Sequence, residues 1–398
     1  MYTPECDYSS SKSPSILKKI SNYKEKSSRI KHLGQVFTPP SIVDYMWQLS
    51  KNYGRVLEPS CGDGAFFRED VNMVMIEKDP TTKPPSNTIL MDFFDYPATE
   101  KFDTIIGNPP YVRNRDIDRI TQCNLDYRMF DRHANLYLFF IKKCIEHLNH
   151  AGELIFITPR DFIKATGAAK LNEYIYSQGT ITHFKDCGDD KIFANASPNC
   201  AIWRFVKGLY SHTTDAGDKF NITDGQIYFG KESSHRIKDY FDVKVGAVSG
   251  ADNVYENNQG NVEMVCSKTY KTGATKTMIY NQKHPSLLNH KDKLINRGIR
   301  KFNEGNWWEW GRSYPQDDRE RVYVNAKTRH HRPFFTHPAK AFDGAVLALF
   351  PKVDFAGQMD KTCDRLNDLD WEKLGFVTGG RFIFNQRSLE NAPIDKLL

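Results

Sequence analysis

The residues best suited to chemistry lie in the segment FDTIIGNPPYVR, residues 102–113, where an apolar run ends in Asn108, Pro109, Pro110 and Tyr111. The exocyclic amine of adenine is a poor nucleophile, because its lone pair is delocalised into the ring. Two acceptors directed at its hydrogens would draw the nitrogen toward tetrahedral geometry, and the Asn108 side-chain oxygen and the Pro109 carbonyl can supply them. Consecutive prolines lack N–H groups and fix φ, which holds the carbonyls rigidly. The pattern predicts activation of a base amine, with the face of Tyr111 available for stacking.

Three shorter apolar runs precede this segment, and each is closed by an acidic residue. The first ends at Glu58 before a turn that contains Gly62, the second ends at Glu77, and the third leads into Asp92 and Phe93. In an open parallel sheet, ligands lie beyond the carboxyl ends of the strands, and glycines let the backbone approach them closely. Glu77 can accept from ribose hydroxyls and Asp92 from an exocyclic amine, while Phe93 can lie against an adenine ring. Since no GxxxxGK[ST] motif is present, these residues predict a pocket for a nucleoside without a phosphate chain.

A nucleoside pocket beside an amine-activating motif indicates direct, in-line methyl transfer from a sulfonium to nitrogen, carried by positioning and electrostatics. A duplex hides the adenine amine, so the base must be flipped out at a cost of about a few kcal/mol. Stacking on an aromatic side chain can offset roughly 1–3 kcal/mol per base. Tyr111 and Phe193 are the candidates for this stacking, and an ordinary core role stays open for Phe193. For the Asn-Pro-Pro-Tyr segment, the alternative is a tight turn that only closes a strand.

Strand-like and helix-like segments alternate through the first half of the chain. Apolar runs typical of strands cover residues 55–58, 71–77, 88–91, 103–107, 153–158, 180–184 and 200–206, and helical spacing covers 41–52, 134–150 and 162–178. This alternation predicts an α/β fold with a mostly parallel sheet and crossover helices. The segment KIFANASPNCAIWRFV reads as a hairpin-like return, which predicts an antiparallel edge strand.

Composition is typical of a globular protein that works in the cytoplasm. The 398 residues are 39% hydrophobic and 26% charged, and the length favours two domains. No apolar run approaches the roughly 18 residues of a membrane span, and the N-terminus lacks the apolar region of a signal peptide. The eight cysteines are scattered without zinc-site spacing, so we expect reduced thiols and no metal.

The net charge of +6 is concentrated in one stretch, because residues 291–340 contain twelve Lys and Arg against six Asp and Glu. Basic residues interleaved with Trp and Tyr suit contacts to phosphates and bases, although a solvated surface is the common alternative. We expect a flexible basic arm at 1–33, a catalytic domain at 34–210 and a DNA-reading domain at 240–398, with the boundary near 208–240. The candidate DNA contacts in this domain are Arg297, Arg300, Lys301, Arg312, Arg329 and Arg332.

Taken together, the motifs match a known family in kind and in order. The chain resembles the gamma group of N6-adenine DNA methyltransferases of bacterial restriction–modification systems. The matching pieces are GQVFTPP (34–40), LEPSCGDGAF, MIEKD, MDFF, NPPY, GELIFITP (152–159) and KIFANASPNCAIWRF (191–205). The resemblance covers residues 34–207. It implies a Rossmann-like S-adenosylmethionine-dependent methyltransferase sheet, followed by a mixed α/β target-recognition domain.

The resemblance also implies a role for individual residues. Those expected to bind S-adenosylmethionine are Thr38, Glu58, Pro59, Gly62, Glu77, Asp92, Phe93 and Asn108. Asn108, Pro109 and Tyr111 would act on the target adenine, and Phe193 would stack on it. The implied partners are double-stranded DNA and, functionally, a cognate restriction endonuclease from which methylation protects host DNA; we expect no membrane contact and a monomer.

The chain departs from the family pattern at one place, where only six residues, 65–70, separate the glycine turn from the second strand. The usual intervening helix must therefore be very short or replaced by a loop, which puts a helix N-terminus contact to the cofactor in doubt. The charged stretch 113–133 is interpreted as a mobile loop over the catalytic mouth.

Two other functions stay open at this point. A protein-glutamine or RNA methyltransferase could use the same Asn-Pro-Pro-Tyr chemistry on a planar amide or amine. A DNA-binding subunit that has lost catalysis could retain the fold. A cytosine-C5 enzyme is excluded, because it needs a nucleophilic cysteine in a Pro-Cys setting and the sequence contains no Pro-Cys dipeptide.

Overall fold

The fold was analysed in a computed structural model, which describes residues 37–188, 199–231, 233–352, 358–378 and 380–394. The arm expected at 1–33 and Phe193 lie outside the described residues. The chain divides into two compact units, the first ending at Ala216 and the second beginning at Gly217. Within the described residues, no helix is both long and apolar enough to cross a membrane.

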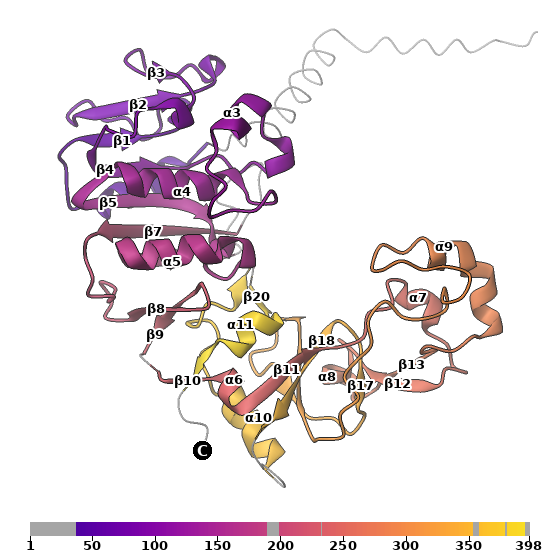
Figure 1. The fold of residues 1–398 in the computed structure, drawn as a ribbon. Coiled ribbons are helices and arrows are strands. Elements are labelled where there is room, and N and C mark those ends of the chain that lie inside the picture. Colours follow the sequence, from indigo (N-terminus) through magenta and orange to yellow (C-terminus); the bar gives the residue numbers. More distant parts are fainter. Residues whose placement is uncertain (1–36, 189–198, 232, 353–357, 379, 395–398) are drawn as a thin grey trace, which may run out of the picture. The chain divides into compact units, whose positions relative to one another are not determined.

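Unit 1 is built on one seven-stranded sheet with the order β3-β2-β1-β4-β5-β7-β6 (Figure 1). Its strands are β1 (Val56–Glu58), β2 (Met73–Glu77), β3 (Ile89–Leu90), β4 (Phe102–Gly107), β5 (Leu148–Pro159), β6 (Gly179–Asp186) and β7 (Cys200–Lys207). The pairs β2–β3, β1–β2, β1–β4 and β4–β5 are parallel. The carboxyl ends of these five strands therefore meet at one edge of the sheet, as the sequence predicted.

The antiparallel strand is β7, and it pairs with both β5 and β6. The sequence predicted that this antiparallel strand lies at the edge of the sheet. In the structure β7 is the second strand from the edge, and β6 is the edge strand. The chain returns after β6 as strand β7, which lies between β5 and β6. Because β7 has a neighbour on each side, its apolar residues Ala201, Ile202 and Trp203 are buried.

Helices cover the sheet of unit 1. They are α2 (Pro40–Gln48), α3 (Arg119–Asn124), α4 (Leu136–His147) and α5 (Ala169–Gln178). Figure 1 shows α4 and α5 in front of the sheet, while α2 buries Trp47 against Ile106 and Ile155 of β4 and β5. The helix expected at 162–178 begins only at Ala169, after two 3-10 turns that include Gly167. Gly167 disfavours a regular helix there.

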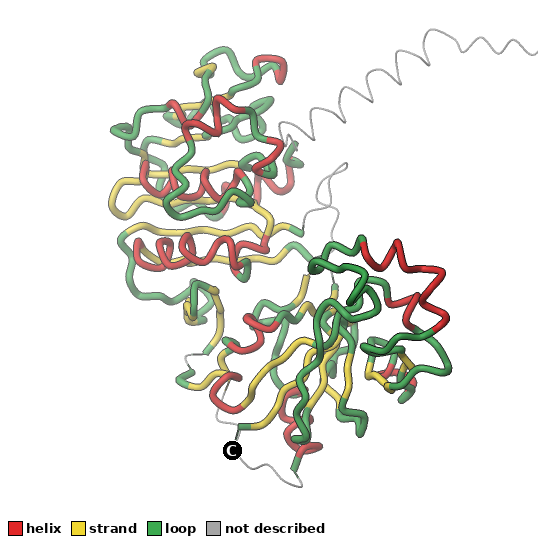
Figure 2. Tube along the Cα trace, turned by 45° about the vertical axis from the view of Figure 1, so that its right-hand side comes forward, coloured by secondary structure: helices red, strands yellow, loops and turns green. Residues whose placement is uncertain are grey.

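Unit 2 consists of several small sheets and short helices (Figure 2). Its strands are β8 (Lys219–Thr223), β9 (Gln226–Gly230), β10 (His235–Arg236), β11 (Phe241–Val245), β12 (Val262–Val265), β13 (Lys276–Met278), β14 (Val322–Asn325), β15 (Lys327–Thr328), β16 (Phe334–Phe335), β17 (Ala341–Phe342), β18 (Val346–Pro351), β19 (Val377–Thr378), β20 (Arg381–Ile383) and β21 (Pro393–Ile394). Its helices are α6 (Ile237–Tyr240), α7 (Asp252–Tyr255), α8 (Thr269–Thr272), α9 (Lys291–Ile295), α10 (Met359–Asn367) and α11 (Gln386–Glu390).

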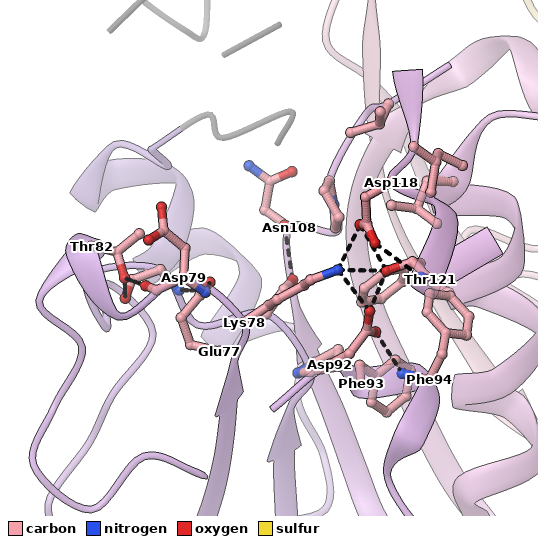
Figure 3. A pocket seen from close by; sticks show the side chains of 18 of the residues that line it. Glu77, Lys78, Asp79, Thr82, Asp92, Phe93, Phe94, Asn108, Asp118 and Thr121 are labelled. Carbon is pink, nitrogen blue, oxygen red and sulfur yellow. Dashed lines mark hydrogen bonds and ion pairs between the residues drawn. The ribbon is translucent and has the colours of Figure 1, made fainter. Parts of the chain in front are cut away.

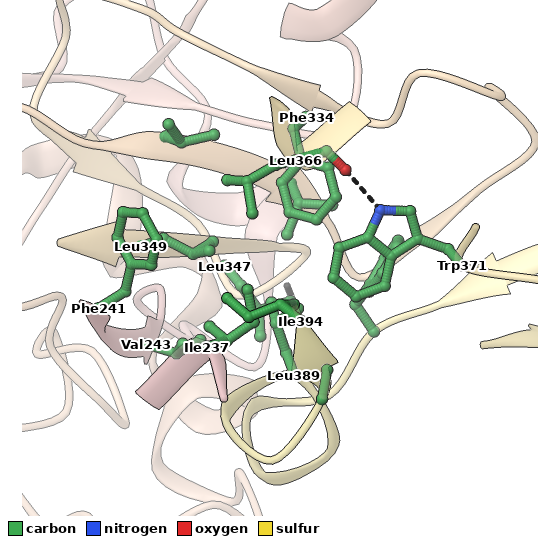
Figure 4. Packing of buried hydrophobic residues seen from close by; sticks show 14 of the residues in the cluster. Ile237, Phe241, Val243, Phe334, Leu347, Leu349, Leu366, Trp371, Leu389 and Ile394 are labelled. Atoms are coloured by element: carbon green, nitrogen blue, oxygen red, sulfur yellow. Dashed lines mark hydrogen bonds between the residues drawn. The ribbon is translucent and has the colours of Figure 1, made fainter. Parts of the chain in front are cut away.

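The central sheet of unit 2 is antiparallel, with the order β11-β18-β14-β16. One hydrophobic core lies against it, and Figure 4 shows Leu347 and Leu349 of β18 packed beside Phe241 of β11. In the same core Trp371 is buried, and its indole N–H donates to the carbonyl oxygen of Leu366 at 2.7 Å. Unit 2 thus has a core of its own.

Candidate active site

A pocket opens at the carboxyl ends of β1, β2 and β4 (Figure 3). Six of the residues predicted from the sequence line it: Pro59, Gly62, Glu77, Asp92, Phe93 and Asn108. Thr38, Glu58, Pro109 and Tyr111 are absent from its walls, and the contacts of Thr38 and Tyr111 place them directly behind Asn108.

Gly62 and Glu77 form one wall of the pocket. Gly62 has a φ of +56°, which favours glycine, and a Cβ atom built on it would meet nothing within 4 Å. The Glu77 carboxylate accepts the backbone N–H of Gly62 and that of Asp79, both at 2.7 Å. Burial raises the Glu77 pKa, and these two bonds oppose that rise by stabilising the charged form. The carboxylate is thereby oriented at the tip of β2.

Glu58 is buried at the tip of β1, with 1% of its surface exposed. Its Oε2 atom has no hydrogen-bond partner among the described residues. Burial raises the Glu58 pKa well above the ordinary value, and the nearby charges of Glu77 and Asp63 raise it further. A buried oxygen without a hydrogen-bond partner is costly, so this atom lowers the stability of the fold.

The loop after β3 carries Asp92 and Phe93 on the opposite wall. Asp92 caps a 3-10 turn by accepting the backbone N–H of Phe94 on Oδ1 at 3.0 Å. Lys143 of α4 fixes the same turn, because its ammonium donates to the carbonyl oxygens of Phe93, Phe94 and Tyr96. The Phe93 ring is only 2% exposed, so it supports the pocket wall and presents little of its face to a base.

Asn108 lies at the mouth of the pocket, held by its neighbours on two sides. Its amide nitrogen donates to Thr38 Oγ1 at 3.1 Å, and its Oδ1 atom lies 2.5 Å from the Tyr111 hydroxyl. An amide oxygen has two lone pairs, so it can accept from Tyr111 and from a second donor at the same time. Thr38, predicted as a cofactor ligand, is therefore placed to orient Asn108.

Tyr111 points its hydroxyl into the protein. The hydroxyl lies 2.9 Å from the carbonyl oxygen of Ile157, and burial raises the Tyr111 pKa well above its ordinary value. Its ring meets Tyr137 edge-on, with the ring centroids 6.0 Å apart. In this arrangement Tyr111 supports Asn108 directly, a contact that the sequence analysis did not foresee. Pro109, which follows Asn108 in the chain, is buried.

The pocket residues that the sequence analysis missed include Lys78, Asp118 and Thr121, which contact one another. Lys78 directly follows Glu77, and its ammonium reaches Asp92 at 3.0 Å and Asp118 at 2.6 Å (Figure 3). Asp118 and Thr121 belong to the charged stretch interpreted as a mobile loop. That stretch instead contains α3, whose first turn is capped by the Asp118 carboxylate accepting the N–H of Thr121. The sequence signal that could have indicated this cluster is Lys78, a basic residue directly after the predicted ligand Glu77.

The connection between the glycine turn and β2 is a loop, since residues 61–72 contain no helix. The doubt about a helix N-terminus at the cofactor is therefore justified in this structure. In the turn, the backbone N–H of Gly62 donates to the Glu77 carboxylate.

In the basic stretch of unit 2, the structure does not agree with the prediction that Arg297 contacts DNA. Arg297 is 8% exposed, and its guanidinium donates to the carbonyl oxygens of Leu294, Ser249, Trp307 and Glu309. It is thus a structural residue and cannot contact DNA. The aromatic residues interleaved with the charges are largely core residues as well, because Trp307, Trp310 and Tyr323 are buried.

The other five candidate DNA contacts are exposed. Arg300 pairs with Glu309 at 2.6 Å, and Arg332 pairs with Asp364 and Asp368. Arg312 donates to the carbonyl oxygen of Gly246. Lys301 and Arg329 form no ion pair with another described residue, which makes them the candidates least committed to the fold.

Comparisons with known proteins agree with the motifs. Residues 67–193 match the sequence model of the Eco57I restriction-modification methylase family. The chain is 32% identical over 192 residues to the type II methyltransferase M.HincII of Haemophilus influenzae, which covers 44% of this chain and 38% of the relative. It is 30% identical over 197 residues to M.TthHB8I of Thermus thermophilus, which covers 44% and 45%. The chain thus spans less than half the length of either relative.

Among solved structures, the chain is similar to the type IIL restriction-modification enzyme MmeI in complex with DNA. The TM-score is 0.55 at 10% identity, and the match covers 94% of this chain and 66% of that chain. Such low identity bears on the fold alone. The expected α/β Rossmann-like fold and the resemblance to restriction–modification methyltransferases are confirmed.

Proposed function

We propose that this chain transfers a methyl group from S-adenosylmethionine to the N6 amine of an adenine within a specific sequence of double-stranded DNA. One observation carries the proposal above the others. The Asn108 side chain, an acceptor suited to an exocyclic amine, lies on the mouth of a pocket whose walls carry acceptors for a nucleoside.

The pocket residues fit S-adenosylmethionine. Glu77 at the tip of β2 is oriented by two backbone N–H groups to accept from ribose hydroxyls. The open space above Gly62 leaves room for the cofactor against the backbone. When bound, the cofactor supplies an electrophilic methyl group on its sulfonium.

This chain's own residues then act on the target amine. Asn108 Oδ1 and the Pro109 carbonyl accept the two amine hydrogens, which frees the lone pair of the nitrogen for attack on the methyl carbon. The N–CH3 bond forms as the S–CH3 bond breaks, and the nitrogen afterwards releases a proton. Thr38 and Tyr111 hold the Asn108 amide in one orientation, so its alignment costs little during the reaction.

Duplex DNA is the proposed substrate, with the target adenine flipped out of the stack. Phe193 lies outside the described residues and remains our candidate for stacking on that base. Lys301, Arg312 and Arg329 of unit 2 are the proposed phosphate or base contacts, because their side chains are exposed. In a restriction–modification system, this methylation would protect the host's DNA from a cognate endonuclease.

The test incubates the protein with tritiated S-adenosylmethionine and, separately, duplex DNA, RNA and cell protein. We expect label in duplex DNA, present as N6-methyladenine after digestion to nucleosides. Long-read sequencing of plasmid from an expressing strain then gives the methylated sequence. An Asn108→Ala variant is expected to lose methyl transfer while it still binds the cofactor.

Label in protein or RNA with none in DNA would favour the alternative methyltransferase class. Cofactor binding without label in any substrate would contradict the proposal, as would full activity of the Asn108→Ala variant.

A further inference from the structure

One cluster of charged and polar groups in the pocket takes no direct part in the proposed transfer of the methyl group. It joins Lys78 at the tip of β2, Asp92 after β3, and Asp118 and Thr121 of the segment that contains α3 (Figure 3). Lys78 Nζ lies 3.0 Å from Asp92 Oδ2, 2.6 Å from Asp118 Oδ2 and 2.5 Å from Thr121 Oγ1. We call residues 114–124 the cover segment.

The Lys78 ammonium has three N–H groups and three acceptors within hydrogen-bond distance, so its donor capacity is fully used. Thr121 is 3% exposed, and its hydroxyl also contacts Asp92 Oδ2. Asn124 at the end of α3 adds a second tie to the same loop, since its amide donates to Asp95 Oδ1 at 2.6 Å. The cover segment is therefore bound to the loop after β3 at both ends of its helix.

The cover segment also forms part of the pocket itself. Ile117, Asp118 and Thr121 stand on its wall, opposite Glu77 and Gly62. Without the charge of Lys78, Asp92 and Asp118 would face each other across Thr121 as two carboxylates. Like charges at such short range repel, so the wall would separate from the loop after β3.

We propose that Lys78 is a positioning residue for the cofactor, which holds the cover segment against the pocket and fixes the Asp92 carboxylate for the base of the nucleoside. This role rests on the proposed function, because it assigns the pocket to S-adenosylmethionine. Lys78 acts through Asp92 and the cover segment and does not itself take part in methyl transfer.

The first experiment measures hydrogen exchange of the backbone amides of residues 114–124 in the cofactor-free protein. Lys78→Met keeps the apolar stem and removes the charge, so we expect faster exchange across the cover segment. Lys78→Arg keeps the charge, and we expect it to restore much of the protection. Lys170→Met, at an exposed lysine on α5, is the matched control and should leave the exchange unchanged. Unchanged exchange in Lys78→Met would overturn the proposal.

The second experiment measures binding of S-adenosylhomocysteine by calorimetry. We expect Lys78→Met to weaken binding by roughly tenfold, the size of one lost charge-assisted interaction. Asp118→Asn should weaken binding less, and the double variant should bind better than Lys78→Met alone, because it removes the repulsion between Asp118 and Asp92. At saturating S-adenosylmethionine, methyl transfer by Lys78→Met should approach the normal rate, so the defect appears in KM and not in kcat.

The two experiments separate the two proposals. If the unaltered protein binds no S-adenosylhomocysteine, the proposed function fails, whereas the exchange data still decide whether Lys78 holds the cover segment. If it binds normally and Lys78→Met binds equally well, the positioning role is wrong and the proposed function stands.

Discussion

The tips of the parallel strands in unit 1 and the basic stretch of unit 2 both contain residues of types that often bind ligands. The two regions place these residues differently. In unit 1, Glu77 and Asp92 end adjacent strands and line one pocket. In unit 2, Arg297 and Trp310 look equally well suited to binding, yet their N–H groups donate to backbone carbonyl oxygens of the fold. Residue type alone therefore does not distinguish a site from a core.

The difference lies in what each backbone imposes. In a parallel sheet, all strands end at one edge, so a polar residue that follows a strand lies near the ligand crevice. Unit 2 is made of short strands in several small sheets, where no such rule fixes the side that a loop residue faces. The role of a charged residue is consequently easier to predict from the sequence in unit 1 than in unit 2.

The largest expected effect is a loss of stability when the buried Arg297 is replaced. Arg297→Met would leave four backbone carbonyl oxygens without their donor, and we expect it to lower the free energy of unfolding by about 3 kcal/mol. Urea unfolding followed by tryptophan fluorescence measures this loss. The exposed Arg329→Met is the control and should stay within about 0.5 kcal/mol of the unaltered protein. Equal stabilities would show that Arg297 is not structural.

The second effect concerns the support of Asn108 in unit 1. Tyr111→Phe removes the hydroxyl that contacts Asn108 Oδ1 and the Ile157 carbonyl, so we expect kcat to fall roughly tenfold, the equivalent of one hydrogen bond. Single-turnover methylation measures the rate, and calorimetry should show unchanged cofactor affinity. Tyr53→Phe, at an exposed tyrosine, is the control. A normal rate in Tyr111→Phe would mean that the hydroxyl does not orient Asn108.

A smaller effect follows from the burial of Glu58. Its pKa is raised in the folded protein, so the folded state holds a proton that the unfolded state releases, and stability is lost as the pH rises above the ordinary carboxyl pKa. Glu58→Gln removes this loss, and we expect a gain of about 1 kcal/mol at pH 8 and little change at pH 4. Urea midpoints at both pH values measure it, with the exposed Glu69→Gln as the control. A gain that is the same at both pH values would contradict this origin.

The smallest effect tests whether any exposed charge of unit 2 contacts DNA. Lys301→Gln and Arg329→Gln should each weaken DNA binding a few-fold and reduce the salt slope by about 1 if the side chain contacts a phosphate. Fluorescence anisotropy with duplex DNA at several salt concentrations measures both quantities. Lys170→Met in unit 1 serves as the comparison. An unchanged slope would identify the altered residue as a solvated surface group.

The sequence predicted the sheet of unit 1 well, because each strand is an apolar run closed by a turn signal. It also predicted which strand ends carry the pocket, since Glu77, Asp92 and Asn108 follow those runs directly. It did not predict the partnership of Lys78 with Asp118, which lies 40 residues along the chain and depends on where α3 folds back. The supporting roles of Thr38 and Tyr111 were hidden for the same reason, as both are set by tertiary contacts with Asn108.

The loop that replaces a helix after β1 has a consequence for turnover under the proposed function. No helix N-terminus adds positive potential there, and the described pocket walls carry the carboxylates of Glu77, Asp79, Asp92 and Asp118 against the single ammonium of Lys78. Such walls attract a cationic sulfonium, and that attraction disappears when methyl transfer leaves a neutral thioether. The spent cofactor is therefore held less tightly than the fresh one, which favours its exchange after each methylation.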